Sequence, residues 1–554
     1  MHPRTKLKMN KLIKTNQLIT YLSFFILAAG AGFRLFHFFH NRSLWMDEIY
    51  LSSSLLHMSY HDLAVLPLDY QQKAPILFLW SVKLVLNTFG NSEMTLRFIP
   101  LLASLISLII YYKVCKYFLD SWGQIIALSI FCFSPALIYH SVEIKQYAVE
   151  SLATIIALYL FISYKDKIAW KSKIIWGIFG AFILWFSYAS IFVFAGIAIG
   201  LSFYYLLKKE WRLLFTNLVP FLIWFVSFII NYLLFTHKHA ESAWIVYWFK
   251  AYDNFMPLIP VSIHELKWFP VNLYQMMDYP LGLVWNFKKI ADNFIVDAIK
   301  IPFIPVLLLV TGLNFLYKKD RKLCYIFLSV IAFTLIASGL YLYPLTERFW
   351  VFIAPIFILL IAFGFEYYSQ KISSLKFRLL ISIILILSPL SQSVYFLLWP
   401  AEFYKNKKSF QRESLLYIQK NYKKGDAVYV YWNDLPGYKV YKQIFNLSFE
   451  AIQGRDYRSS STDFKSYNQQ LQNDFIKFKG KKRLWLVYNT QFLTDIGDQI
   501  DEPKWYYEGE KKGISNLLSE FYKQGKPLNK IVTSDVTICL FSLNNLKQKA
   551  TSAD

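Results

Sequence analysis

The stretch LITYLSFFILAAGAGFRLFHFF (residues 18–39) decides the class of this protein. A bilayer core about 30 Å thick requires roughly 20 apolar residues in a helix, and this run is long enough to cross it. It is too long for the core of a signal peptide, and no small-residue cleavage site follows it. The basic segment 1–17 precedes it. We therefore interpret the run as a retained first span whose basic flank lies in the cytoplasm.

The composition of the whole chain agrees with a membrane protein. Its 554 residues are 56% hydrophobic, 19% aromatic and only 17% charged. The formal net charge of +23 could serve nucleic-acid binding. However, many Lys and Arg residues form short clusters between apolar runs, which is typical of cytoplasmic loops that face anionic lipid. We therefore expect membrane lipid, and no nucleic acid, as a partner.

A scan for further apolar runs predicts an α-helical polytopic membrane protein with about eleven transmembrane helices. The block 173–207 is one long apolar stretch, which we divide near Tyr188 into a tight hairpin. The predicted spans are 18–39, 97–118, 123–140, 147–164, 173–189, 190–207, 213–235, 300–317, 323–342, 349–368 and 378–398.

The loops between these runs predict the topology. With the N-terminus inside, the Lys- and Arg-rich loops all become cytoplasmic and the short opposite loops are poor in both residues, as the positive-inside rule requires. The cytoplasmic segments are 1–17, about 112–122, 165–173, 208–212, 318–322 and 369–378. We expect a multi-pass protein of the cytoplasmic (inner) membrane. Eleven spans place residues 400–554 outside, and an error of one span would reverse that placement.

The chain is predicted to contain two domains, a transmembrane domain (1–399) and a small extracytoplasmic α/β domain (400–554). The second begins where the composition changes. It contains a helix-like pattern at 411–422, strand-like patterns at 427–432 and 483–489, and a hairpin pattern at 530–543 with Ser534-Asp535 at its turn. Two other outer segments are long: 40–96, with a short apolar helix at 74–85 that suits the membrane interface, and 236–299.

The motif Ser43-Leu44-Trp45-Met46-Asp47-Glu48 follows the first span directly. Two adjacent carboxylates are costly to hold near hydrocarbon. Burial would raise the pKa of such a carboxylate and make it a competent general base. An ordinary acidic loop in water remains the alternative.

Several further charged residues lie at outer helix ends. Lys73 precedes a Pro-started helix, where ammonium and helix N-terminus can bind an anion, or where the Lys can simply reach the lipid headgroups. Glu143 and Lys145 occupy a very short loop, and either could bind substrate or cap the next helix. Arg348 could grip a lipid phosphate with two hydrogen bonds, or contact headgroups. Acids for an acceptor and cations for a phosphate on one membrane face suit a transferase with a lipid-phosphate donor.

The order of these motifs resembles a known family. The chain is similar to the GT-C glycosyltransferases of the protein O-mannosyltransferase and lipid A aminoarabinose transferase type, in the RgtA/B/C/D-like bacterial branch. The resemblance covers roughly residues 15–400, and its fold is expected to be GT-C. The matching elements are WMDE (45–48), KAPIL (73–77), FGNSEMTLR (89–97), EIKQY (143–147) and ERFW (347–350).

The resemblance implies an inverting transfer of a sugar from a polyprenyl-phosphate donor to a glycan, lipid or protein acceptor. It implies Asp47 as the catalytic base, with Glu48 and Glu143 as further acidic positions. The cations Lys73, Arg348 and Lys145 match donor-phosphate ligands, and Tyr147 matches a substrate-binding position. The sequence departs from the family's pattern at two positions. Lys145 stands where the family usually has Arg, and Ala74 stands where it often has Pro.

No cofactor and no metal site is expected. The four Cys residues show no metal-binding or disulfide spacing, and no DxD-type motif is convincing. Two other functions remain open at this point. A lipid or sugar transporter (flippase) would place its ionisable groups near the bilayer midplane rather than at helix ends. A surface-assembly protein would use residues 400–554 as its working part.

Overall fold

The computed structural model describes residues 3–237, 243–285, 300–372, 374–403, 409–490, 503–507 and 512–543. By their contacts the residues form two compact units. Unit 1 comprises 1–41, 58–90 and 94–403, and unit 2 comprises 42–57, 91–93 and 404–554. The division into domains 1–399 and 400–554 stays a prediction. Unit 2 adds two short N-terminal segments to the C-terminal residues.

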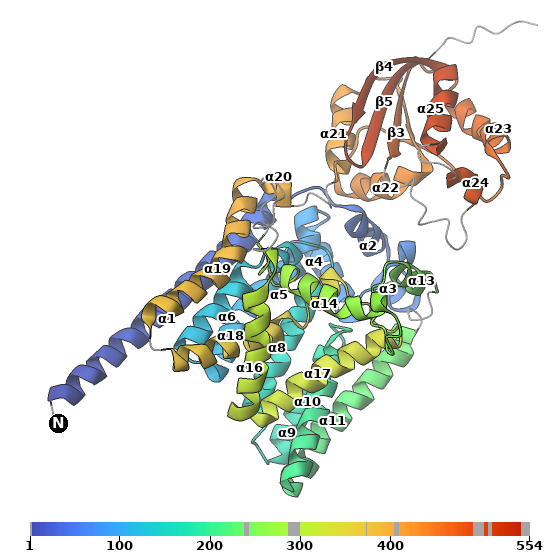
Figure 1. The fold of residues 1–554 in the computed structure, drawn as a ribbon. Helices are drawn as coiled ribbons and strands as arrows, with labels where there is room; N and C mark the ends of the chain where they lie inside the picture. The colour runs from blue at the N-terminus through green and yellow to red at the C-terminus, as the bar shows by residue number, and fades with distance from the viewer. Residues whose placement is uncertain are drawn as a thin grey trace, which may run out of the picture. The chain divides into compact units, whose positions relative to one another are not determined.

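The described part of unit 1 is built from helices (Figure 1). Every predicted span overlaps at least one of them, and the predicted hairpin within 173–207 is confirmed by the end of one helix at Ile183 and the start of the next at Ser190. The helices are α1 (Pro3–His40), α3 (Tyr60–Val65), α4 (Ile76–Phe89), α5 (Glu93–Phe118), α6 (Ser121–Phe133), α7 (Pro135–His140), α8 (Tyr147–Tyr164), α9 (Trp170–Ile183), α10 (Ser190–Lys208), α11 (Trp211–Asn231), α13 (Ala243–Ala251), α14 (Ile263–Asp278), α16 (Phe303–Lys319), α17 (Arg321–Gly339), α18 (Ala354–Lys371), α19 (Leu375–Leu398) and α20 (Pro400–Phe403).

Seven helices of the described chain are long and apolar enough to cross a membrane. The chain is therefore a polytopic α-helical membrane protein, while the total of eleven spans stays a prediction. The remaining predicted spans fall on α6, α9, α16 and α18, which have 13, 14, 17 and 18 residues. The seven segments are Gln17–His40, Glu93–Phe118, Tyr147–Tyr164, Ser190–Lys208, Trp211–Thr236, Arg321–Gly339 and Leu375–Leu398.

One predicted span is not continuous. The run 123–140 divides into α6 and α7, because Pro135 has no N–H to continue the hydrogen bonding of α6. Hydrocarbon offers no substitute partner for the carbonyls released at such a break. Here the fully buried guanidinium of Arg34 on α1 donates to the carbonyl oxygens of Cys132 (3.0 Å) and Phe131 (3.2 Å). Arg34 thus stabilises the helix break that precedes α7.

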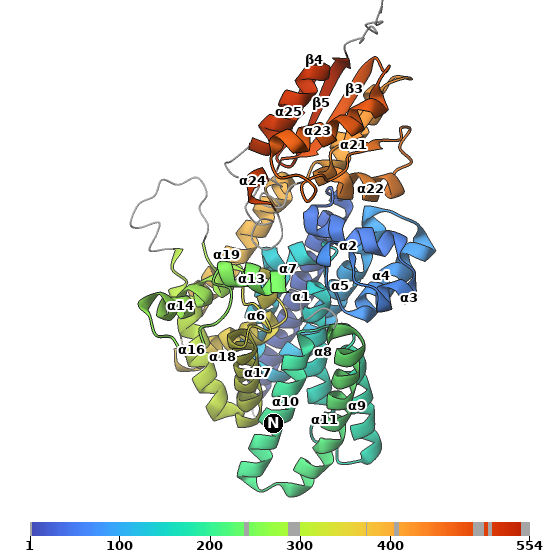
Figure 2. The same ribbon diagram turned by 90° about the vertical axis from the view of Figure 1, so that its right-hand side faces the viewer.

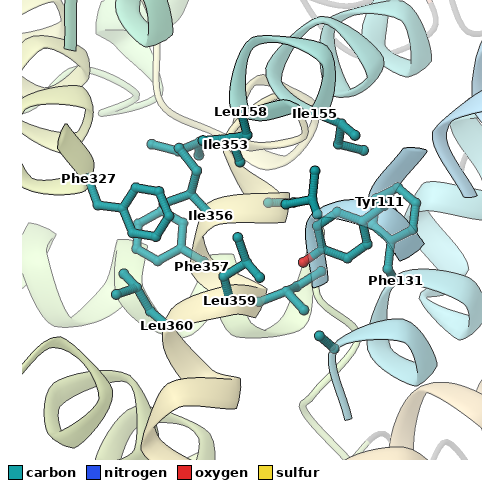
Figure 3. Packing of buried hydrophobic residues seen from close by; sticks show 14 of the residues in the cluster. Tyr111, Phe131, Ile155, Leu158, Phe327, Ile353, Ile356, Phe357, Leu359 and Leu360 are labelled. Carbon is teal, nitrogen blue, oxygen red and sulfur yellow. The ribbon is translucent and has the colours of Figure 1, made fainter. Parts of the chain in front are cut away.

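Helix α18 lies at the centre of the hydrophobic core of unit 1. Every residue of α18 from Ala354 to Glu366 is buried, so this helix is apolar on all sides and occupies the core. Figure 3 shows Ile356, Phe357, Leu359 and Leu360 of α18 packed with residues of neighbouring helices. Tyr111 of α5 lies in the same cluster and donates its hydroxyl hydrogen to the carbonyl of Pro355, at 2.9 Å.

Two glycines allow α16 and α18 to approach closely (Figure 2). A Cβ atom on Gly312 would lie 1.9 Å from the carbonyl oxygen of Leu360. A Cβ atom on Gly364 would lie 2.0 Å from the carbonyl oxygen of Leu308. Small residues that permit backbone contact are a common way to pack helices within a membrane, where the hydrophobic effect does not distinguish lipid from protein.

We expect Gly312→Ala to destabilise the protein by about 1–3 kcal/mol, because the added methyl group overlaps a backbone atom that cannot move independently. The matched control is Gly32→Ala on α1, where a Cβ atom meets no other atom within 4 Å. Thermal unfolding of both detergent-solubilised variants would measure the difference. Equal melting temperatures for the two variants would contradict the close packing of α16 on α18.

Unit 2 contains a five-stranded mixed sheet in the order β2-β1-β3-β5-β4. The strands β2, β1 and β3 are parallel, whereas β3, β5 and β4 are antiparallel. The predicted helix 411–422, the two predicted strands and the predicted hairpin are all confirmed. The elements are α2 (Met46–His57), α21 (Gln411–Asn421), β1 (Ala427–Val430), α22 (Leu435–Ile444), β2 (Ile452–Gln453), α23 (Phe464–Phe475), β3 (Arg483–Asn489), α24 (Lys504–Tyr507), α25 (Lys512–Gln524), β4 (Gly525–Val532) and β5 (Val536–Leu543).

Helices cover both faces of this sheet (Figure 2). Successive side chains of a strand point to opposite faces. In β3, Leu484, Leu486 and Tyr488 therefore join one core, which Phe475 of α23 and Phe521 of α25 complete. On the other face, the ring of Trp485 packs against that of Tyr417 on α21. Because both faces are covered, β1 and β3 read as nearly continuous apolar runs in the sequence.

Candidate active site

The short loop between α7 and α8 in unit 1 buries an acid and a histidine. The carboxylate oxygen Oε2 of Glu143 lies 2.6 Å from Nδ1 of His140. The side chains are only 0% and 1% exposed, respectively. The loop turns tightly, since the amides of Ser141 and Val142 donate to the carbonyls of Ile138 and Tyr139. The sequence pattern predicted the acid here but assigned no role to the histidine.

Tyr279, which follows α14, completes a chain of three hydrogen-bonding groups. Its hydroxyl contacts Nε2 of His140, the ring nitrogen opposite the one that faces Glu143. If the Glu143 carboxylate accepts from Nδ1, then Nε2 is the acceptor of the tyrosine hydrogen. Burial raises the pKa of Tyr279 well above its ordinary value, and the charges of Glu143 and Glu347 raise it further. Tyr279 is therefore a neutral hydroxyl at physiological pH.

The guanidinium of Arg348 lies in the same neighbourhood. Arg348 belongs to a single 3-10 turn (Glu347–Trp350). Its guanidinium carbon lies 6.0 Å from the ring centre of Tyr147 and 5.6 Å from that of Phe349. The Tyr147 ring in turn lies 4.9 Å from the ring of His140. Arg348, about 200 residues from Glu143 and Tyr147 in sequence, thus lies beside Tyr147 in the cluster around His140.

Lys145 and Lys73 differ in their surroundings. The ammonium of Lys145 is buried and donates to the side-chain oxygen of Gln72. Lys73 is half-buried, and within the described part of the chain its ammonium forms no hydrogen bond or ion pair. Burial lowers the pKa of Lys73. A partly desolvated, unpaired cation gains strongly from an incoming anion, so Lys73 is the better suited of the two to bind a phosphate.

The two acids of the WMDE motif lie in the first turn of α2, in unit 2. Glu48 is completely buried and accepts a hydrogen bond from Nη1 of Arg42 at 2.6 Å. It also accepts from the backbone amide of Trp45, at 3.3 Å. Asp47 is partly exposed. Burial and ion pairing favour a structural role for Glu48, and they leave Asp47 as the more accessible acid. A catalytic role for either residue stays a prediction.

This ion pair makes a testable prediction. Glu48→Leu should cost about 3–5 kcal/mol of folding free energy, because it leaves the Arg42 guanidinium buried without its carboxylate. The double variant Arg42→Met/Glu48→Leu should recover most of that loss, since it removes both charges. Thermal unfolding of the two proteins tests the pair. A double variant less stable than Glu48→Leu would contradict this account of the two residues.

The structure adds residues that sequence reasoning missed. His140 and Gln72 stand beside predicted motifs, so their positions were visible but their roles were not. Arg42 precedes the acidic motif and had no pattern of its own. Tyr279 lies in the long segment 236–299, predicted to be outside, where nothing marked it. Glu150, one helical turn into α8, is a further buried acid. Burial raises the pKa of Tyr343 well above its ordinary value, and the charge of Glu150 raises it further.

The described residues contain no group of three or more His, Cys, Asp or Glu side chains that could hold a metal ion. The expectation that the protein needs no metal stays a prediction. All four Cys residues are buried and unpaired as thiols. Asp47 and Glu48 belong to unit 2. The cluster around His140 belongs to unit 1.

Comparisons with known proteins identify the fold. The family model for dolichyl-phosphate-mannose-protein mannosyltransferase matches residues 73–235. The crystal structure of ArnT from Cupriavidus metallidurans in the apo state is similar, with a TM-score of 0.51, 11% identity, and coverage of 91% of this chain and 96% of that chain. The chain has the GT-C fold. The predicted resemblance to the protein O-mannosyltransferase and lipid A aminoarabinose transferase type is thereby confirmed, and the RgtA/B/C/D-like branch stays a prediction.

A second crystal structure gives the same result. ArnT from the same organism, bound to undecaprenyl phosphate, has a TM-score of 0.51 and 10% identity, and the match covers 95% of this GT-C chain and 98% of the other. No curated protein matches the chain significantly in sequence. The likeness to both ArnT structures therefore concerns the fold, and the chemistry must be argued from the residues.

Proposed function

We propose that this protein is a membrane glycosyltransferase that moves a sugar from a polyprenyl-phosphate donor to a hydroxyl of a cell-envelope acceptor. The observation that carries the proposal is the GT-C fold, shared over nearly the whole chain with a protein crystallised with undecaprenyl phosphate. The unpaired, half-buried Lys73 supports it, because it offers a cation to a phosphate group. The acceptor class is a glycan, a lipid or a protein.

In the proposed reaction, Asp47 takes the proton of the acceptor hydroxyl. The acceptor oxygen attacks the anomeric carbon of the donor sugar from the side opposite the phosphate. The bond between that carbon and the phosphate oxygen breaks, and its electron pair leaves with the polyprenyl phosphate. The single displacement inverts the configuration of the anomeric carbon. Asp47 afterwards returns its proton to water. General-base assistance of this kind contributes roughly 10²- to 10⁴-fold to rate.

In this proposal, the side chains of Lys73 and Arg348 bind the phosphate of the leaving group. Negative charge grows on the bridging oxygen as the sugar departs, and fixed cations stabilise this transition state more than the ground state. Arg348 can present two N–H groups to phosphate oxygens. Lys145 has an amide partner in Gln72, so its proposed contact with the donor would require exchange of that hydrogen bond.

Glu143 and Tyr147 are assigned to the surroundings of the donor. Glu143 orients the His140 ring, and that ring orients the hydroxyl of Tyr279. While its hydrogen is donated to Nε2 of His140, the neutral Tyr279 hydroxyl can accept a hydrogen bond from a sugar hydroxyl without adding charge. Tyr147 offers an aromatic face beside Arg348. In this proposal Glu143 acts by positioning other groups, whereas Asp47 handles the reacting proton.

We also propose that transfer occurs on the outer face of the cytoplasmic membrane, with residues 400–554 outside the cell or in the periplasm. The clustering of Lys and Arg in the loops assigned to the cytoplasm supports this orientation. The proposed site residues all belong to loops and helix ends that the same rule assigns to the outer side.

Lipid analysis of cells that lack the protein would test the proposed donor. We expect a polyprenyl-phosphate sugar to accumulate, together with an acceptor that lacks this sugar, because the transfer step is missing. Expression of the wild-type chain should reverse both changes, and expression of Asp47→Asn should reverse neither. Normal levels of every polyprenyl-phosphate sugar in the deficient cells would contradict the proposed donor class.

A further inference from the structure

One hydroxyl in unit 2 connects the segment before the acidic motif to the C-terminal residues. Tyr441 of α22 is completely buried. Its hydroxyl oxygen accepts a hydrogen bond from the backbone amide of Leu44 (2.7 Å) and lies 2.9 Å from Oγ of Ser43. The same hydroxyl donates to Oε1 of Glu93 (2.6 Å). A single tyrosine thus holds two consecutive residues of the 43–48 motif.

Arg412 of α21 adds a second connection to the same place. Its backbone amide donates to Oγ of Ser43 (3.3 Å), and its guanidinium pairs with Oε2 of Glu93. Burial, and next the charge of Glu93, raise the pKa of Tyr441 well above its ordinary value. The hydroxyl therefore remains protonated and able to donate to Glu93 while it accepts from Leu44. Glu93 thus has Arg412 and Tyr441 as partners.

We propose that Tyr441, supported by Arg412, is a positioning residue that fixes the direction of the first turn of α2 and hence the carboxylate of Asp47. The inference rests on the proposed function of Asp47 as the base. It assigns a task to the C-terminal residues, which carry no chemistry of their own that the sequence reveals. The amide of Leu44 and the hydroxyl of Ser43 lie three and four residues before Asp47, so a hydrogen bond to them sets where the helix begins.

The hydrogen bonds within the motif explain why the first turn of α2 needs support from Tyr441 and Arg412. Within the motif, the Arg42–Glu48 ion pair joins the two ends of the turn to each other. Such an internal pair stabilises the turn but does not fix its orientation on a larger body. The contacts of Tyr441 and Arg412 supply that orientation from helices packed on a sheet. A general base must be held to within about 0.5 Å of its productive position, which requires a rigid support of this kind.

Tyr441→Phe removes the hydroxyl and little else. We expect kcat for transfer to fall by roughly tenfold to hundredfold, as misplacement of a reacting group by about 1 Å would cause. The KM for the donor should remain nearly unchanged, because no donor ligand is altered. The matched control is Tyr438→Phe on the same helix: that side chain is also completely buried, and its hydroxyl accepts from the amide of Ala451 (2.9 Å). It should retain the wild-type kcat.

Hydrogen exchange measures the positioning without an assay of activity. In Tyr441→Phe, the amide of Leu44 and its neighbours should exchange faster, whereas the amides of β1 and β3 should keep their protection. Arg412→Gln provides a milder second variant, since its side chain is 20% exposed. It should lower kcat in the same direction by a smaller factor, with the donor KM nearly unchanged.

These experiments distinguish failure of the proposed base, Asp47, from failure of the proposed positioning residue, Tyr441. If Asp47→Asn transfers sugar at the wild-type rate, the proposed base is wrong and the inference falls with it. If Asp47→Asn is inactive but Tyr441→Phe and Arg412→Gln keep the wild-type kcat, the base stands and the positioning role is wrong. If Tyr441→Phe loses protection throughout β1 and β3, and Arg412→Gln is fully active, Tyr441 is merely structural and the inference is overturned.

Discussion

Asp47→Asn is expected to lower kcat for sugar transfer by about 10²- to 10⁴-fold, because the amide cannot accept the proton of the acceptor hydroxyl. The substitution keeps the size and shape of the side chain. Folding, membrane insertion and the KM for the donor should therefore remain close to wild type. Steady-state kinetics with the purified protein and a polyprenyl-phosphate sugar would measure the effect.

A matched control for this variant is Asp253→Asn. Asp253 follows α13 in unit 1, its side chain is 69% exposed, and nothing assigns it to the site. It should transfer sugar at the wild-type rate, which would show that loss of one acidic charge is not harmful by itself. A wild-type kcat in Asp47→Asn, with normal folding, would remove Asp47 from the mechanism.

Lys73→Met is expected to raise the KM for the donor by roughly 10- to 100-fold, the loss that follows when a hydrogen bond to a charged group is removed. The change removes the unpaired cation but keeps an apolar side chain of similar length in the half-buried site. Lys83→Met on α4 is a suitable control, because Lys83 is also partly buried and is not assigned to the donor. An unchanged donor KM in Lys73→Met would contradict the proposed phosphate ligand.

The pH dependence of donor binding supplies an independent signature of Lys73. Because burial lowers the pKa of this ammonium, its positive charge is lost at a lower pH than that of an exposed Lys. The donor KM of the wild type should therefore rise as the pH increases through the lowered pKa. Lys73→Arg keeps its charge at every accessible pH and should flatten this rise. The same rise in Lys73→Arg would assign the titration to another group.

The helical framework could be predicted from the sequence because a membrane imposes a simple length rule on apolar runs. The same rule could not locate the break between α6 and α7. Pro135 lies inside a continuous apolar run, and the donors that satisfy the carbonyls at the interruption, Arg34 and Ser393, come from distant helices. The strands β1 and β3 were visible because buried parallel strands have continuous apolar sequences, and the final hairpin was visible from its turn residues.

The candidate site could be predicted only in part, for a physical reason. Motifs at helix ends are local in sequence, so Glu143, Lys73 and Arg348 could be identified one by one. Hydrogen bonds between distant segments leave no local pattern. Tyr279 contacts His140 across 139 residues, and Tyr441 contacts Ser43 across 398 residues. The partner of Glu48 was close in sequence, but only the structure shows that the Arg42 side chain turns back to meet it.

The most direct test of the proposed glycosyltransferase uses purified protein in liposomes that contain a polyprenyl-phosphate sugar labelled in the sugar. Two quantities are followed together: release of free polyprenyl phosphate on addition of an envelope extract as the acceptor, and movement of the intact donor between the two leaflets. We predict release that depends on the acceptor and is abolished by Asp47→Asn. Donor that changes leaflets but is never cleaved would contradict the account and identify a transporter.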